Sequence, residues 1–413
     1  MSTAVGIAPT RVQTAPVADG ALLDRLPSSS GALSWVRRGE GLVGWGVAAR
    51  LEVRGPDRFA QAARWWRQLC DSWSVEDDLG LPGCGPVAFG SFTFDEDDPT
   101  SSVLVVPEVV FGRSGEANWV TTVGTGTFPT RAHDVVRPGG LRYSAGKVSV
   151  TAFRQAVAAA AARIRDGELE KLVLAQDLVA QADAEIDARF LLHRLAEQYA
   201  ECWTFAVDGL VGATPELLLR RTGDQVLSRV LAGTAARGAD AVADEMLRER
   251  LLRSDKDLAE HRYAVDSVAG PLAAYCDRLT VPSAPDLLEL ANVSHLVTDV
   301  TGRLHDAAGV DALELAGALH PTAAVGGTPA GSAARLRREL EPMDRGRYAG
   351  PVGWVDSRGD GEWGLALRCA QLSGPSARLF AGCGIVAGSD PDAEVLEAQT
   401  KFVPVRDALE GAG

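Results

Sequence analysis

Short apolar runs separated by glycine-rich turns dominate the first third of the chain. Three of these runs, over 42–53, 85–95 and 103–111, have the length and composition of β-strands. Between the first two runs, apolar residues recur at helical spacing over 56–73 and predict one amphipathic helix. The first third of the chain is therefore expected to combine several strands with a single clear helix.

Helices and strands alternate more regularly after residue 150. Tight turns rich in glycine and aspartate link many of the strands, and such turns favour antiparallel pairing. We therefore expect an α+β fold in which helices lie outside antiparallel sheets. Helices are predicted over 151–166, 184–198, 240–275 (as one helix or two), 311–318 and 331–340, and strands over 169–180, 203–211, 216–221, 225–232, 292–304, 349–356, 363–372 and 378–382.

A stretch rich in turns, residues 118–141, separates the two parts of the chain. We place a boundary at its end, between an N-terminal α+β part over 21–142 and a C-terminal region over 143–413 that carries the candidate chemistry. Residues 1–20 are rich in Ala, Thr, Pro and Val and are predicted to be a loose leader.

Composition narrows the class of protein. The chain has 413 residues, 46% of them hydrophobic, which is enough for a large core. A formal net charge of −14 argues against nucleic acid or an anionic membrane as the main partner. No apolar run approaches membrane-spanning length. The first residues show neither a basic start nor an apolar signal core, so we do not expect export. The six cysteines are scattered without CxxC spacing, as is typical of reduced thiols, so we expect a cytoplasmic protein.

The most informative polar cluster lies near the C-terminus. An apolar run ends at Gly382 and Gly384, which we interpret as a glycine turn with bare amides. A helix follows, with Ser389 or Asp390 as its cap and Pro391 inside its first turn. Backbone amides and an amine can bind an anion, and carboxylates beside them can bind a hard cation such as Mg²⁺. The combination therefore predicts a small substrate that carries a carboxylate. The charged residues, spaced three and four apart on this helix, are Glu394, Glu397 and Lys401.

Two simpler interpretations compete with this one. Gly382 and Gly384 are typical of a dinucleotide-binding loop, but the third glycine, Gly388, comes one position late and no second strand with a terminal acid follows. Glu397 and Lys401 alone are an ordinary i,i+4 surface pair. Only partners elsewhere in the chain can favour the functional interpretation.

A lysine and a glutamate in two predicted strands are candidate partners. Lys171 lies among Leu and Val residues, where a lysine most often marks a sheet edge. If it instead points into a closed pocket, burial favours the neutral amine, which can then act as a base. Glu216 begins an apolar strand, where an acid most often faces solvent; in a dry site its pKa rises and it can donate a proton.

Several other positions have both a structural and a functional interpretation. The segment that ends at Gly233 and Thr234 is either a plain turn or a close approach to a ligand. Glu260 is either half of a helical salt bridge with Lys256 or a Mg²⁺ ligand, whereas His261 is expected to pack. A buried Arg368 would require an anion, because an unpaired buried guanidinium is costly.

With these motifs in place, residues 145–410 resemble the chorismate-binding enzymes. This family includes isochorismate synthase, salicylate synthase, the large component of anthranilate synthase and aminodeoxychorismate synthase. The motifs follow the family's order and spacing, whereas the first third matches more weakly, mainly through residues 89–95. The resemblance implies a four-layer α/β/β/α sandwich of two antiparallel sheets with the active site between them.

The resemblance also implies a role for each candidate residue. Lys171 would be the base that activates water and Glu216 the acid. Glu260 and Glu397 would bind Mg²⁺, with Glu394 holding it through water. The positions implied to contact the substrate, chorismate, are Gly233, Thr234, His295, Val325, Tyr348 and Arg368 (the last two at the enolpyruvyl carboxylate), and Gly382, Gly384 and Lys401 at the ring carboxylate.

Within the family, two features favour isochorismate synthase. Lys171 matches the lysine that aminating anthranilate enzymes lack. The loop that begins at His320 resembles the isochorismate synthase loop, whereas salicylate and anthranilate enzymes usually begin it with Phe. Two positions depart from the pattern of the family: Ala323 replaces a proline, and Gln176 replaces a common arginine.

The reaction implied is attack of water at ring carbon 2 of chorismate with loss of the hydroxyl at carbon 4, without a redox cofactor. Salicylate synthase, which eliminates pyruvate after that step, is the nearest alternative. An aminating anthranilate-type synthase and a carboxylate-binding protein without activity are further alternatives. The product would feed menaquinone or siderophore synthesis, which the sequence leaves open, and the resemblance implies a monomer.

Overall fold

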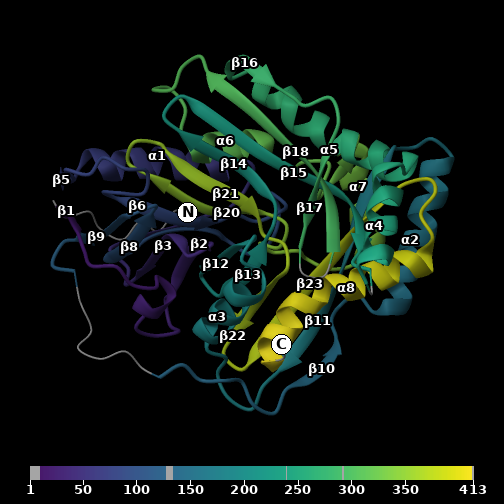
Figure 1. Cartoon of the computed structure of the whole chain (residues 1–413), viewed down its shortest axis with the longest axis horizontal. Helices are drawn as coiled ribbons and strands as arrows, with labels where there is room; N and C mark the ends of the chain where they lie inside the picture. The colour runs from purple at the N-terminus through teal and green to yellow at the C-terminus, as the bar shows by residue number, and fades with distance from the viewer. Residues whose placement is uncertain (1–9, 127–133, 239, 291–292, 412–413) are drawn as a thin grey trace.

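Two large sheets packed face to face form the centre of the molecule (Figure 1). The computed structural model describes residues 10–126, 134–238, 240–290 and 293–411. The first sheet runs in the order β10 (Arg142–Ala145), β11 (Lys171–Gln181), β23 (Ser376–Ile385), β22 (Cys369–Ser373), β13 (Leu210–Thr214), β12 (Trp203–Val207), β2 (Leu33–Arg37), β3 (Glu40–Trp45), β8 (Val109–Ser114), β9 (Ala117–Val123), β1 (Arg11–Pro16) and β5 (Ser74–Glu76), and β19 (Gly327–Thr328) pairs with β11 off this path.

The second sheet faces the first through strands from both parts of the chain. Its order is β16 (Cys276–Thr280), β18 (Val293–Leu304), β15 (Gln225–Ala236), β14 (Leu217–Thr222), β21 (Gly361–Leu365), β20 (Pro351–Asp356), β6 (Val87–Ser91), β7 (Ser102–Val106) and β4 (Ala49–Val53), and β17 (Asp286–Glu289) pairs with β18. Pairing is antiparallel throughout the described residues except between β1 and β5. Where β12 approaches β6 and β20, buried aromatic side chains fill the space, among them Trp35, Phe89, Phe205 and Trp363.

Helices cover the outer face of each sheet and complete the four layers. Those on the first sheet are α2 (Val150–Arg165), α3 (Ala188–Gln198), α7 (Ala330–Leu340) and α8 (Pro391–Glu410). Those on the second are α1 (Arg58–Asp71), α4 (Ala241–Leu252), α5 (Asp255–Ala273) and α6 (Ala312–Leu319), and a short 3-10 turn, η1 (Leu23–Arg25), precedes β2. The α+β class predicted from the sequence and the α/β/β/α layering implied by the family resemblance are both confirmed.

Several predicted strands are in fact two strands joined by a short connection. The run over 203–211 is the hairpin β12–β13, which reverses at Asp208 and Gly209, both with positive φ. The run over 363–372 divides into β21 and β22 at Arg368, whose φ is +47°. The runs over 42–53 and 103–111 divide near Gly46 and Pro107 in the same way. The last three divisions carry the chain from one sheet to the other, and hydrophobicity alone does not register such breaks.

The predicted loose leader is wrong for residues 11–16. These residues form β1, which pairs with β9 and with β5 and places Val12 in the core. Val and Thr at alternate positions account for this strand. Residues 1–9 lie outside the described part of the chain. The boundary near residue 142 stays a prediction, since both sheets mix strands from either side of it.

No helix in the described ranges is long and apolar enough to cross a membrane.

Candidate active site

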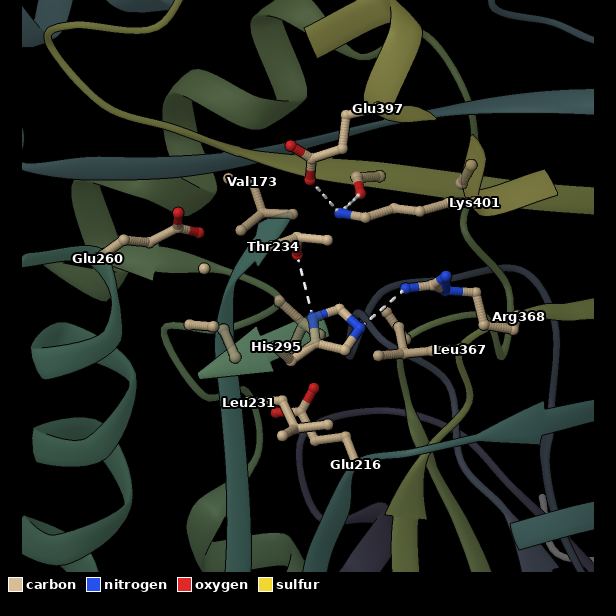
Figure 2. A pocket seen from close by; sticks show the side chains of 18 of the residues that line it. Val173, Glu216, Leu231, Thr234, Glu260, His295, Leu367, Arg368, Glu397 and Lys401 are labelled. Carbon is tan, nitrogen blue, oxygen red and sulfur yellow. Dashed lines mark hydrogen bonds and ion pairs between the residues drawn. The ribbon is translucent and has the colours of Figure 1, made fainter. Parts of the chain in front are cut away.

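A single pocket gathers nearly all of the predicted site residues (Figure 2). It lies between the ends of β11 and β23 in one sheet and β15 and β18 in the other, and the helices α5 and α8 form one wall. The predicted residues that line it are Glu216, Gly233, Thr234, Glu260, His295, Val325, Tyr348, Arg368, Gly382, Gly384, Glu394, Glu397 and Lys401.

Lys171, the predicted base, lies just behind the lining. It is the first residue of β11 and its side chain is fully buried. Its Nζ lies 3.0 Å from Oε1 of Glu260 on α5. The side chain passes Gly384, where a Cβ would lie 3.1 Å from Cε of Lys171. The predicted base is therefore held at the pocket wall by a predicted metal ligand.

Glu216, the predicted acid, lies in the connection between β13 and β14 rather than within a strand. Burial raises the pKa of Glu216 to about 8, although the nearby charge of Lys171 opposes that rise. Its carboxyl group points toward the ring of His295 in Figure 2. At neutral pH this carboxyl group is therefore protonated and able to donate.

A β-bulge in β15 positions Thr234 and its neighbours. The pairing of β15 with β18 shifts register between Ala232 and Thr234, and the intervening Gly233 has a φ of +80°, which favours glycine. Thr234 Oγ1 lies 3.0 Å from Nδ1 of His295. The bulge thus turns the hydroxyl group and the imidazole toward the pocket.

Arg368 and His295 form a cationic face with a neutral imidazole. Arg368 Nη2 lies 3.5 Å from His295 Nε2, so that nitrogen accepts and Nδ1 carries the proton. Burial, together with Arg368 and Lys401, lowers the pKa of His295 to about 3, consistent with a neutral ring. Burial also lowers the pKa of Arg368, and among the described residues no carboxylate forms an ion pair with it. Such a guanidinium is suited to receive an anionic ligand.

Gly382 and Gly384 lie within β23, so the predicted glycine turn is wrong. Val173 and Ala175, which face them across the ladder, donate their N–H groups to Gly326 and Glu341 instead of to β23. These pairs are therefore non-hydrogen-bonded positions, and the amides of both glycines face away from β11. Their missing side chains matter as well, because a Cβ at Gly384 would lie 2.1 Å from Oε1 of Glu260. The turn before α8 lies at 386–389 instead.

The carboxylates of α8 project as a row because of helical spacing. Asp390 caps the helix by accepting from the amides of Asp392 and Ala393, and Pro391 occupies its first turn. Glu394, Glu397 and Lys401 then share one face. Lys401 Nζ lies 2.6 Å from Glu397 Oε1, as drawn in Figure 2. It also donates to the carbonyl oxygen of Gly382 at 2.9 Å.

The donor set fits a hard divalent cation. Three carboxylates from two helices, Glu260, Glu394 and Glu397, border one pocket, and carboxylate oxygens are the ligands that Mg²⁺ prefers. Each of them already lies beside an ammonium group, which shows that each can have a cation as its neighbour. The pKa of Glu394 is raised by burial and by the neighbouring Glu397. A cation would relieve that repulsion.

Several pocket residues escaped the sequence analysis. Asp257 lies one turn before Glu260 on α5 and lines the pocket, and burial raises its pKa. Lys256, considered only as a partner of Glu260, instead reaches Glu394, with Nζ 3.2 Å from Oε1. Cys383, a buried residue of β23 between the two glycines, lies outside the lining, but its Sγ is close to the carboxylate oxygens of Glu394 and Glu397. Helical spacing could have indicated Asp257, since i and i+3 share a face.

A buried ion pair supports the wall that holds Val325. Arg345 is bidentate to Glu341 and also donates to the carbonyl oxygens of Val325 and Val173. Glu341 in turn accepts from the amide of Ala175. The pair therefore links the loop after α6 to β11, and no sequence motif had pointed to it.

Three positions compared with the pattern of the family, His320, Ala323 and Gln176, lie outside the pocket lining. His320 is buried against Phe59 and Phe94, with its Nε2 2.9 Å from the carbonyl oxygen of Phe94. Gln176 and Ala323 are buried away from it as well. His261 packs as predicted, with hydrogen-bonding contacts to the carbonyl oxygen of Ala232 and to Thr298 Oγ1.

Comparisons with known proteins agree with this geometry. The family model described as "Chorismate binding enzyme" matches residues 32–137 and 141–410. Isochorismate synthase MenF of Bacillus subtilis is 33% identical over 406 residues, covering 90% of this chain and 85% of that protein. The vibriobactin-specific isochorismate synthase of Vibrio cholerae is 33% identical over 372 residues, which cover 88% of this chain and 87% of that protein. The structure of MenF, the menaquinone-specific isochorismate synthase of Escherichia coli, superposes with a TM-score of 0.80 at 26% identity. The superposition covers 98% of this chain and 95% of that one.

The chain belongs to the chorismate-binding enzyme family. Its relatives include isochorismate synthases of both the menaquinone and the siderophore type, which confirms the predicted family and supports the predicted isochorismate synthase branch. Enzymes of this family typically depend on a metal ion.

Proposed function

We propose that this protein is an isochorismate synthase that converts chorismate to isochorismate with the help of Mg²⁺. The observation that carries the proposal is Glu216, a carboxyl group held protonated at neutral pH in the pocket beside which Lys171 is buried. An acid and a base at one site are what addition of water with loss of a hydroxyl requires. The relatives named as isochorismate synthases support the same reaction.

The two carboxylates of chorismate find complementary groups in the pocket. The enolpyruvyl carboxylate would lie against Arg368, which has no carboxylate partner among the described residues, with Tyr348 beside it. The ring carboxylate would lie near Lys401 and the amides of Gly382 and Gly384. Thr234 and the neutral His295 would then face the ring.

The reaction needs one proton removed and one proton supplied. Lys171 takes a proton from water, whose oxygen forms a bond to ring carbon 2. The double bonds of the ring shift, the bond from carbon 4 to its hydroxyl oxygen breaks, and Glu216 donates the proton that lets this oxygen leave as water. One water enters and one leaves, so the product is an isomer of the substrate.

Mg²⁺ would be held by Glu260 and Glu397, with Glu394 acting through water. When bound, the cation supplies positive charge that fixes the ring carboxylate and offsets charge that develops during the reaction. Lys171 must separate from Glu260 in that state, because its amine has to be free to accept a proton.

The identity of the product tests this proposal directly. Purified protein is incubated with chorismate and Mg²⁺, and the products are separated by chromatography. Isochorismate without pyruvate is expected, and EDTA should abolish its formation. Fluorescent salicylate with an equal amount of pyruvate would instead identify a salicylate synthase, and turnover only with ammonia would identify an aminating synthase.

The cytoplasmic location and the monomeric state stay predictions. The pathway that receives the product also stays open, since relatives of both types match over most of the chain.

A further inference from the structure

Each of the three carboxylates proposed to hold the metal has its own lysine. Glu260 is paired with Lys171 at 3.0 Å, Glu397 with Lys401 at 2.6 Å, and Glu394 with Lys256 at 3.2 Å. The first two lysines belong to the proposed catalytic and substrate-binding groups. Lys256 has no part in the proposed reaction, so its place beside the metal ligands requires a separate explanation.

The three lysines differ in their access to solvent. The side chain of Lys171 is fully buried and that of Lys401 is 16% exposed and also bound to the carbonyl oxygen of Gly382. The side chain of Lys256 is 41% exposed, whereas that of its partner Glu394 is only 3% exposed. Of the three ammonium groups, that of Lys256 therefore has the open route into water.

The charges around the pocket already balance without a metal. Apart from Arg345, which is paired with Glu341, four cationic side chains face four carboxylates, while Glu216 is protonated. A divalent cation would leave an excess of two positive charges, and departure of one ammonium group would halve that excess. The cations are Lys171, Lys256, Arg368 and Lys401, and the carboxylates are Asp257, Glu260, Glu394 and Glu397.

We propose that Lys256 is a displaceable counter-cation: it neutralises Glu394 in the metal-free protein, withdraws into solvent when the divalent cation binds, and thereby weakens metal affinity. The inference rests on the proposed function for the identity of the metal. Lys256 lies one helical turn before Glu260 on α5, so its withdrawal requires rotation of one side chain and leaves the metal ligands in place.

The test is a calorimetric titration of Mg²⁺ into protein without chorismate. Lys256→Met removes the charge and keeps most of the side-chain volume, and it should lower the Kd for Mg²⁺ about tenfold. Lys256→Arg keeps the charge and should bind Mg²⁺ close to the wild-type level. Lys147→Met is the matched control, since Lys147 pairs with Asp344 at the surface, and its Kd should not change.

Melting temperatures provide a second measurement. Without Mg²⁺, Lys256→Met should melt below the wild type, because Glu394 and Glu397 lose a counter-charge, and saturating Mg²⁺ should raise its melting temperature more than that of the wild type. If Lys256→Met does not fold, Lys256→Gln takes its place.

An unchanged or raised Kd in the neutral variants would overturn the inference, as would the absence of Mg²⁺ binding to the wild type. Neither result depends on turnover of chorismate. Failure of the counter-cation role is therefore distinguishable from failure of the proposed activity.

Discussion

The two walls of the pocket differ in how their charges are balanced. On the helical wall, formed by α5 and α8, every metal-ligand carboxylate has an ammonium partner. On the strand wall, formed by β15, β18 and the bend at Arg368, the guanidinium has no ion-pair partner among the described residues and lies within hydrogen-bond distance of a neutral imidazole. The charges of the helical wall are balanced within that wall, whereas the positive charge of the strand wall is not.

This difference indicates what each wall is prepared to receive. A buried cation without a carboxylate gains when an anion arrives, so the strand wall favours the substrate carboxylate. A carboxylate that is already paired with a lysine can bind a metal ion only if the metal replaces that lysine. The helical wall is therefore suited to a metal ion that displaces its ammonium groups. The amines freed by this exchange then become available for chemistry, as Lys171 must be.

Removing the proton-transfer groups should have the largest effect. We expect Lys171→Ala or Glu216→Gln to lower kcat by about 10²–10⁴-fold, because each removes a general acid or base. Chromatographic assay of isochorismate measures the change, and an unchanged melting temperature shows that the fold is retained. Turnover at the wild-type level after Lys171→Ala would refute its role as the base, whereas loss of chorismate binding alone would indicate a structural role.

Removing the positive charge of the strand wall should have the next largest effect on activity. We expect Arg368→Met to lower kcat/KM by about 10–100-fold, mainly through KM, because a charge-assisted hydrogen bond to the substrate is lost. Arg303→Met is the control, since Arg303 forms an exposed pair with Asp224. Equal effects of the two substitutions would remove the distinction between the walls.

The pH profile tests the protonated state of Glu216. Its pKa of about 8 means that the proton needed for donation is present below pH 8 and is lost above it. We expect kcat/KM to fall about tenfold for each pH unit above 8. A decline that begins near pH 5, as for an ordinary carboxyl group, would show that Glu216 is not the acid in the free enzyme.

A methyl group at Gly384 should have the smallest of these effects on turnover. Its Cβ would meet Oε1 of Glu260, which lies at the end of a flexible side chain and can move away. We expect Gly384→Ala to weaken Mg²⁺ binding about tenfold with little loss of activity at saturating Mg²⁺. An equal loss at every Mg²⁺ concentration would place the effect on the substrate instead.

The sequence indicated the elements better than their ends. Helices and strands with a clear period were predicted close to their observed positions. The hairpin at Asp208 and the crossing between sheets at Arg368 both went unpredicted. The Asp-Gly pair at 208–209 is a hairpin signal that lay inside an apolar run, whereas positive φ at Arg368 leaves no composition signal. β1 was missed because its Val and Thr residues stand among alanine and proline, where the strand pattern is weak.

For the site, the residues were predictable but their pairing was not. Spacing on α8 placed Glu394, Glu397 and Lys401 on one face, and the family resemblance supplied the remaining positions. The contact of Lys256 with Glu394 joins residues 138 positions apart and depends on how α5 packs beside α8. No local pattern predicts such a pair.

A crystal structure with Mg²⁺ and the reaction product would test the two-wall account most directly. The account predicts the metal between Glu260 and Glu397, the enolpyruvyl carboxylate on Arg368, and the amine of Lys171 separated from Glu260. A product carboxylate distant from Arg368, or a metal bound while all three lysines keep their carboxylate partners, would contradict it.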